Sequence, residues 1–88
     1  MPAISLGHLL PGDSAKVVNV WGEEGVCRRL MDMGLVRGTV VRIVKVAPLG
    51  DPMELEVLGY HLSLRRDDAH CIRVVALEGQ NSELPVSS

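Results

Sequence analysis

A few side chains of this sequence could bind a metal ion, namely three histidines, two cysteines and several aspartates. Asp67 and His70 lie three residues apart, which would form half of a site across a turn, and His61 precedes them. His70 and Cys71 are adjacent, and neighbouring side chains of a strand point apart. Because a structural zinc site needs four close ligands, the pattern predicts at most a weak site at His61, Asp67 and His70. We expect no required cofactor, and only adventitious or regulatory binding of zinc or iron.

Motifs for catalysis are not found along the chain. It contains no GxSxG elbow, no HExxH pair and no GxxxxGK[ST] phosphate loop, so we expect no enzymatic activity. Residues 48–52, PLGDP, contain a glycine but lack the lysine and the following helix of a phosphate site. They also lack the acidic ligands of a calcium loop. The two prolines and the Gly50-Asp51 pair instead predict a stiff structural corner between two strands.

The composition of the 88 residues indicates one small domain with no surface for nucleic acid. The net charge is -2 and the basic residues are scattered, whereas nucleic-acid affinity comes from clustered Lys and Arg. The N-terminus does not resemble a signal peptide, and no charge-free run approaches the roughly 20 residues that span a bilayer. Two separated cysteines, Cys27 and Cys71, do not form a secreted disulfide scaffold. We therefore expect a reduced, cytoplasmic domain with no direct membrane insertion.

Residues 23–33 predict a helix, because Val26, Leu30 and Met33 recur at the spacing of one helical face, and Gly34 follows as a helix stop. The opposite face carries charges and one methionine, a combination that can bind a protein partner. We predict partner contacts on this face, in the loop after it and at the tip of the corner: Arg28, Arg29, Met31, Asp32, Leu35, Val36, Leu49 and Asp51. The alternative is a merely solvated helix face, with the two apolar loop residues in the core.

The remaining sequence predicts a mainly β domain. Residues 5–10 predict one helical turn capped by Ser5, and residues 66–70 predict a turn or short helix. Five segments predict strands: residues 15–21, 39–47, 53–58, 60–65 and 71–75. Segment 39–47 is apolar in both phases, so we expect both of its faces to be covered. Short strands with glycine turns favour a small, partly open SH3-like β-barrel with one inserted helix.

The domain is expected to comprise residues 1–75. Residues 76–88 are polar and aperiodic, which predicts a flexible C-terminal tail. Small barrels of this kind have exposed edge strands, which leaves open a weak homodimer through an edge.

Two stretches, RRLMDMGLVRGTVV at 28–41 and VAPLGDPMELEVLGYHLSLRRDDAHCIRV at 46–74, resemble the FeoA family of bacterial ferrous iron uptake. The resemblance covers residues 5–75. It departs from the family pattern at Arg37, where proline is common, and at Asp68, where glutamate is usual. The resemblance implies an SH3-like barrel with an inserted helix. It also implies a cytosolic, non-enzymatic accessory role beside FeoB, the membrane Fe(II) transporter that carries a G-protein domain.

Two other functions stay open at this point. One is a metal-sensing or metal-delivering module for iron or zinc. The other is a regulatory domain of the kind that closes some iron-dependent repressors, where it acts by intramolecular contact. The second is weakened because the sequence contains no segment that predicts a DNA-recognition helix.

Overall fold

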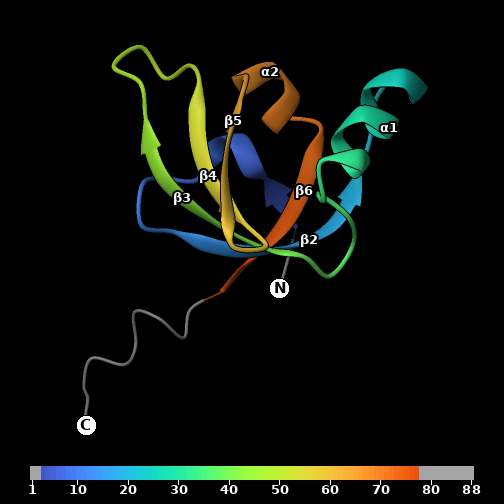
Figure 1. Cartoon of the computed structure of the whole chain (residues 1–88), viewed down its shortest axis with the longest axis horizontal. Coiled ribbons are helices and arrows are strands. Elements are labelled where there is room, and N and C mark those ends of the chain that lie inside the picture. Colours follow the sequence, from blue (N-terminus) through green and yellow to red (C-terminus); the bar gives the residue numbers. More distant parts are fainter. Residues whose placement is uncertain (1–2, 78–88) are drawn as a thin grey trace, which may run out of the picture.

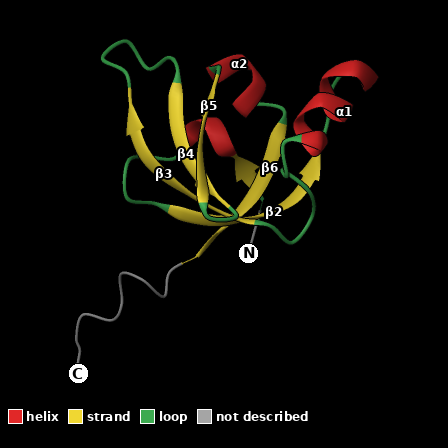
Figure 2. Ribbon diagram, in the orientation of Figure 1, coloured by secondary structure: helices red, strands yellow, loops and turns green. Residues whose placement is uncertain are grey.

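The computed structural model describes residues 3–77 and shows one antiparallel sheet that curls around an apolar core (Figures 1 and 2). Its strands follow one another in space in the order β1-β6-β2-β3-β4-β5, so the sheet is not closed. The strands are β1 Ile4–Ser5, β2 Ser14–Val20, β3 Val40–Val46, β4 Met53–Val57, β5 Tyr60–Leu64 and β6 Ile72–Leu77. The predicted fold class, a mainly β, partly open barrel with an inserted helix, is confirmed.

Strand β4 shows most simply how the sequence places residues inside and outside the sheet. Met53, Leu55 and Val57 are fully buried, whereas Glu54 and Glu56 between them are partly exposed. Successive side chains of a strand point to opposite faces, so this alternation keeps one face of β4 towards the core. The same alternation fixes the register of β4 against its neighbours, since a slip by one residue would expose all three apolar side chains.

The core is aliphatic, as a sequence without phenylalanine requires. It draws on every strand and on both ends of the chain that the structure describes. The buried apolar residues are Leu6, Leu9, Ala15, Val17, Leu30, Leu35, Val41, Ile43, Met53, Leu55, Val57, Leu64, Ala69, Ile72 and Val74.

The two faces of β3 differ, which corrects the expectation that both would be covered. Val41 and Ile43 are buried, but Val40 is 49 % exposed on the outer face, opposite Lys16 of β2. The apolar residues in both phases therefore reflect the general preference of strands for valine and isoleucine as much as burial. At the other end of the sheet, β6 runs to Leu77 and so includes two residues that were expected to lie in the tail. Residues 78–88, the rest of that predicted tail, lie outside the described residues.

Three short helices complete the fold. The 3-10 turn η1, Leu6–His8, begins where Ser5 Oγ accepts a hydrogen bond from the Gly7 amide at 3.0 Å, as predicted for a cap. Helix α1, Glu24–Asp32, follows β2, and helix α2, Arg66–Ala69, connects β5 to β6. The chain leaves α1 through Gly34 at φ +98°, a left-handed conformation that glycine adopts without strain. Both α-helices lie at one end of the curled sheet (Figure 1).

Candidate functional site

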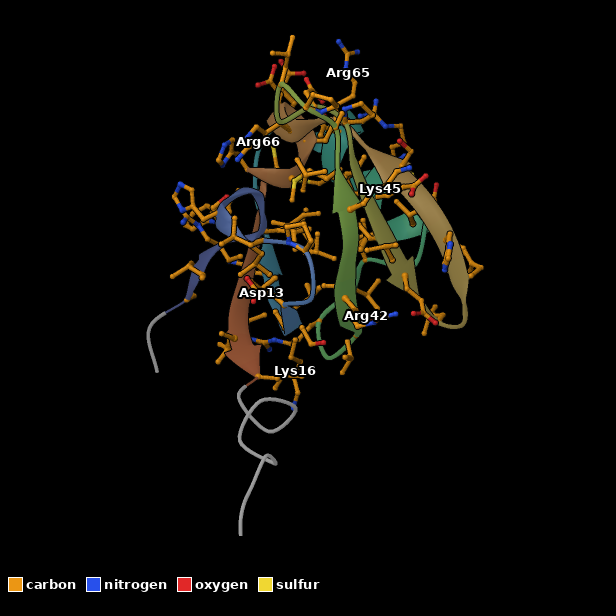
Figure 3. The ribbon with its side chains drawn as sticks, turned by 90° about the vertical axis from the view of Figure 1, so that its left-hand side faces the viewer. Asp13, Lys16, Arg42, Lys45, Arg65 and Arg66 are labelled. Carbon is orange, nitrogen blue, oxygen red and sulfur yellow. The ribbon has the colours of Figure 1, made fainter. Side chains whose placement is uncertain are left out.

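The Pro48–Pro52 corner is fastened to α2 by two hydrogen bonds. The Asp51 carboxylate accepts from the Arg66 backbone amide at 3.0 Å, and the Arg66 guanidinium donates to the Gly50 carbonyl at 2.6 Å. The other arm of that guanidinium donates to the Gly7 carbonyl at 2.9 Å. Arg66 lies between the corner and the first turn of the chain (Figure 3). The carboxylate of Asp51 therefore has a structural partner, which accounts for its presence without any external ligand.

The tip of the corner presents one apolar side chain to solvent. Leu49 is 95 % exposed, the highest exposure among the large apolar residues that the structure describes. The backbone beneath it is held by a hydrogen bond of 2.7 Å from the Gly50 amide to the Ala47 carbonyl, with Gly50 at φ +87°. Leu49 is thus an exposed apolar side chain on a loop whose backbone is held by a hydrogen bond.

The outer face of α1 is polar and exposed, as the sequence predicts. Arg28 pairs with Glu24 one turn earlier at 3.4 Å, an exposed contact that contributes little to stability. Arg29 instead reaches Asp68 in α2 at 2.9 Å and ties the two helices together. Met31 is 45 % exposed and Asp32 is exposed beside it. The helix therefore offers one apolar side chain among charges.

One predicted contact residue is in the core. Leu35 is fully buried, so it cannot form part of a docking surface, and this prediction is corrected. The helix ends at Asp32, and the chain turns back through Gly34 so that the Leu35 amide bonds to the Leu30 carbonyl at 3.1 Å. This turn directs Leu35 under the helix, whereas Val36, the next residue, stays 41 % exposed.

An open groove of about 370 Å³ lies between α1 and the end of β2. Met31 and Val36 line one side, and Arg37 donates to the Val18 carbonyl at 3.4 Å on the other. From β2, residues 18–20 also line the groove. The segment just before β3 still bonds to Val17, because the Val17 amide donates to the Thr39 carbonyl and the Gly38 amide donates to the Val17 carbonyl, both at 2.8 Å. The edge of β2 that faces the groove therefore begins at residue 18. The sequence did not indicate residues 18–20 or Arg37 because the groove depends on where β3 begins to pair.

The structure separates the predicted metal candidates. His61 lies on β5 opposite Glu56, whereas His70 ends α2 and shares a hydrogen bond of 2.6 Å with Ser5 Oγ. The His70 ring also meets the His8 ring edge-on, with centroids 5.3 Å apart. Within residues 3–77, no group of three or more His, Cys, Asp or Glu side chains is arranged to hold a metal ion. Metal binding at His61, Asp67 or His70 stays a prediction.

Figure 3 shows the basic side chains of Lys16, Arg42, Lys45, Arg65 and Arg66 on one face of the molecule, together with Asp13. Arg42 on β3 pairs with Glu56 on β4 at 3.0 Å, and Lys45 lies opposite Glu54 in the same pair of strands. Arg42 is thus neutralised by Glu56, whereas no ion pair within residues 3–77 involves Lys16, Lys45 or Arg65. As for membranes, none of the helices within residues 3–77 has the length and apolar character needed to span one.

Comparison with known proteins places this arrangement in a family. The FeoA domain family matches residues 4–76. A curated relative, the Fe(2+) transport protein A/Fe(2+) transporter FeoB fusion protein of Porphyromonas gingivalis, is 36 % identical over 83 residues. That alignment covers 94 % of this chain but only 10 % of the relative, so the chain spans about a tenth of its length.

Solved structures agree with this match. The FeoA-like protein from Clostridium acetobutylicum has a TM-score of 0.82 and 42 % identity, over 88 % of this chain and 90 % of that one. FeoA of Stenotrophomonas maltophilia, complexed with zinc and described as an SH3 domain protein, has a TM-score of 0.70 and 30 % identity. It covers 86 % of this chain and 92 % of that one. On the family match and these relatives, the chain belongs to the FeoA domain family.

Proposed function

We propose that this chain is a non-enzymatic, cytoplasmic accessory protein of ferrous iron uptake that docks on the cytosolic part of a FeoB-type transporter. The observation that carries the proposal is the Porphyromonas gingivalis relative, in which a related sequence and FeoB are parts of one fusion protein. Two functions that are joined in one chain in one organism commonly act together as separate chains in another. Docking by a separate FeoA domain would restore that association.

The docking surface we favour is the α1 groove, defined by Met31, Val36, Arg37 and residues 18–20. It combines two half-exposed apolar side chains with a guanidinium and the open edge of a strand. Interfaces are commonly centred on a few apolar or arginine anchors surrounded by polar residues. Arg28 and Asp32 lie on the same helix and would form the polar rim, while Leu49 at the corner is a second, separate contact point.

The test is a binding measurement between the purified chain and the cytosolic G-protein domain of its FeoB-type partner. The variants Met31→Asp and Val36→Asp place a carboxylate in the α1 groove, and each should weaken binding by about tenfold or more, the loss expected for an interface anchor. Leu10→Asp is the matched control. Leu10 is 66 % exposed, in the turn between η1 and β2, which lies across the molecule from α1 in Figure 1.

The possible outcomes distinguish an error in the proposed docking surface from an error in the proposed docking function. Binding that survives both groove variants but fails with Leu49→Asp would move the docking site to the corner. Absence of any binding by the unsubstituted chain, with the partner free, GDP-bound or GTP-bound, would contradict the docking function itself.

A second candidate function, metal sensing or delivery, is favoured by one observation. A relative at 30 % identity was crystallised as a zinc complex, and this chain holds its His8 and His70 rings side by side. Anaerobic calorimetry with Fe(II) and Zn(II), repeated on His61→Ala and His70→Ala, distinguishes this function from docking. Binding that is lost in either variant would support it.

A further inference from the structure

The only two cysteines of the sequence, Cys27 and Cys71, both lie next to the same glycine, Gly22. The Cys27 thiol, on the first turns of α1, contacts the Gly22 carbonyl with Sγ to oxygen at 3.6 Å. The Cys71 thiol, just before β6, would lie 3.3 Å from a Cβ built on Gly22. Gly22 has φ +110°, and its missing side chain is what leaves room for Cys71 beside the approach of α1.

Further contacts hold the two thiols in this arrangement. The Trp21 amide donates to the Cys71 carbonyl at 2.7 Å, so the segment that leads into α1 is tied to the start of β6. On the other side of the pair, Arg29 of α1 bonds to Asp68 at 2.9 Å. Both cysteines are half-buried and are free thiols. The fold therefore brings together two thiols that are widely separated in sequence and leaves both within reach of a small solute.

The surroundings of Cys71 distinguish the two sulfurs. Burial raises the pKa of the Cys71 thiol above the ordinary value of 9.0, and the charges of Asp68, Cys27 and Asp67 raise it further, while Arg29 lowers it. Since the thiolate is the nucleophile, a thiol that stays protonated reacts slowly with oxidants. Cys71 is therefore poorly suited to attack the peroxide itself, and its thiolate acts in the second step, as the resolving thiol.

We propose that Cys27 and Cys71 form a redox site, in which hydrogen peroxide converts the two thiols into one intramolecular disulfide. The Cys27 thiolate attacks a peroxide oxygen, an S–O bond forms, the O–O bond breaks, and a sulfenic acid and hydroxide result. Cys71 Sγ then attacks Cys27 Sγ, the S–S bond forms and the S–O bond breaks. The two thiol protons leave with the oxygens as two molecules of water, and the sulfurs together lose the two electrons that reduce the peroxide.

The disulfide would fix α1 to the start of β6 by a covalent bond. In the reduced chain, α1 is held by its one fully buried side chain, Leu30, by the partly buried Val26, and by polar contacts. A cross-link lowers the conformational entropy of the unfolded chain. It would also prevent α1 from separating from the start of β6. The site is independent of the proposed docking function, because it requires only the thiols and an oxidant.

The experiment treats the reduced full chain with a small excess of hydrogen peroxide in native buffer and identifies the products by intact mass and peptide mapping. The expected product is a monomer that has lost two hydrogens, with the Cys27 and Cys71 peptides joined until dithiothreitol is added. Its thermal unfolding midpoint should rise and return on reduction. In Cys71→Ser, dimedone should trap a sulfenic acid at Cys27.

A matched reaction in denaturant serves as the control for the role of the fold. Disulfide formation should be faster in native buffer than in urea, because only the folded chain holds the sulfurs together. Formation of disulfide-linked dimers alone, retention of both thiols, or oxidation of single cysteines to sulfinic acid would each overturn the proposal. Equal rates in buffer and in denaturant would overturn it as well.

Discussion

At the scale of single residues, the contacts of the corner explain why Gly50 and Asp51 are adjacent in the sequence. Asp51 accepts a hydrogen bond from the first amide of α2 and so acts as a helix cap supplied by a distant part of the chain. A Cβ at Gly50 would lie 2.6 Å from the Arg66 guanidinium, so a side chain there would displace the arginine from its two carbonyl partners. Both residues are used to join the corner to α2.

Replacement of Asp51 tests this cap. Asp51→Ala should lower the free energy of unfolding by about 1 kcal/mol, the usual cost of losing a cap, whereas Asp51→Asn should retain most of it because the amide oxygen still accepts. Urea denaturation gives both values. Leu49→Ala, at the exposed neighbouring position, should stay within about 0.5 kcal/mol of the unsubstituted chain. If Asn were as damaging as Ala, the carboxylate would have a role other than accepting this bond.

The sequence predicted the corner from local chemistry but not its partner. Prolines restrict the backbone and glycine permits the left-handed conformation of a tight turn wherever they occur, so the turn is visible in the sequence. The contact with Arg66 joins positions that come together only in the folded sheet. The proximity of Cys27 to Cys71 also arises only in the folded chain, so it could not be predicted. Each cysteine taken alone resembles a small apolar residue.

At the scale of elements, α1 is attached to the domain at few points. Leu30 is its one buried residue, Arg29 pairs with Asp68, and no side chain caps its N-terminus. Just beyond the helix, the Tyr60 hydroxyl on β5 donates to the Met33 carbonyl. Contacts along its length, including that of the partly buried Val26 near its N-terminus, therefore orient the helix, and its C-terminal half lines the α1 groove.

Truncation of Leu30 should therefore affect stability far more than truncation of its neighbour. Leu30→Ala should cost about 2–5 kcal/mol, as for other buried leucines, while Leu30→Met should cost less than about 1.5 kcal/mol. Met31→Ala should change the free energy of unfolding by no more than about 0.5 kcal/mol. Chemical denaturation measures all three. Similar losses for Leu30→Ala and Met31→Ala would show that α1 packs differently from the arrangement described.

Helical periodicity predicted α1 and the burial of Leu30, but it could not predict whether the Leu35 side chain is buried or exposed. The helical repeat ends at Met33, and after a left-handed glycine the direction of the next side chain depends on the turn. Only the position of the sheet beneath decides that Leu35 goes inward and Val36 outward. Alternation within β4 was predictable for the opposite reason, because a strand has a fixed period of two.

At the scale of the whole molecule, Arg66 joins three distant parts of the chain. From α2 it reaches the Gly50 carbonyl in the corner and the Gly7 carbonyl in η1, while its own amide bonds to Asp51. The sheet itself is not closed, and these bonds bridge the first turn of the chain and the end of β3. One forked, permanently charged side chain suits this task because its two arms can donate in different directions.

The substitution Arg66→Lys tests how much the two-armed guanidinium group of Arg66 contributes to stability. Lysine keeps the charge but cannot reach both carbonyls with separate planar donors, so we expect a loss of about 1–2 kcal/mol in the free energy of unfolding. Arg65→Lys is the matched control, since Arg65 is the exposed neighbour, and it should be nearly neutral. Guanidinium denaturation compares the two. Equal effects of the two substitutions would indicate that charge alone, rather than the paired hydrogen bonds, matters at Arg66.

The strand order leaves β1 and β5 at the two ends of the sheet. β1 has two residues and offers little backbone, but β5 has five, with exposed Tyr60, His61 and Ser63 and no proline or lysine within Tyr60–Leu64. Such a strand carries amide and carbonyl groups that another backbone can pair with. At high protein concentration, we therefore expect the chain to self-associate first through β5. A charged residue introduced at Ser63 is the change that would best keep concentrated samples monodisperse.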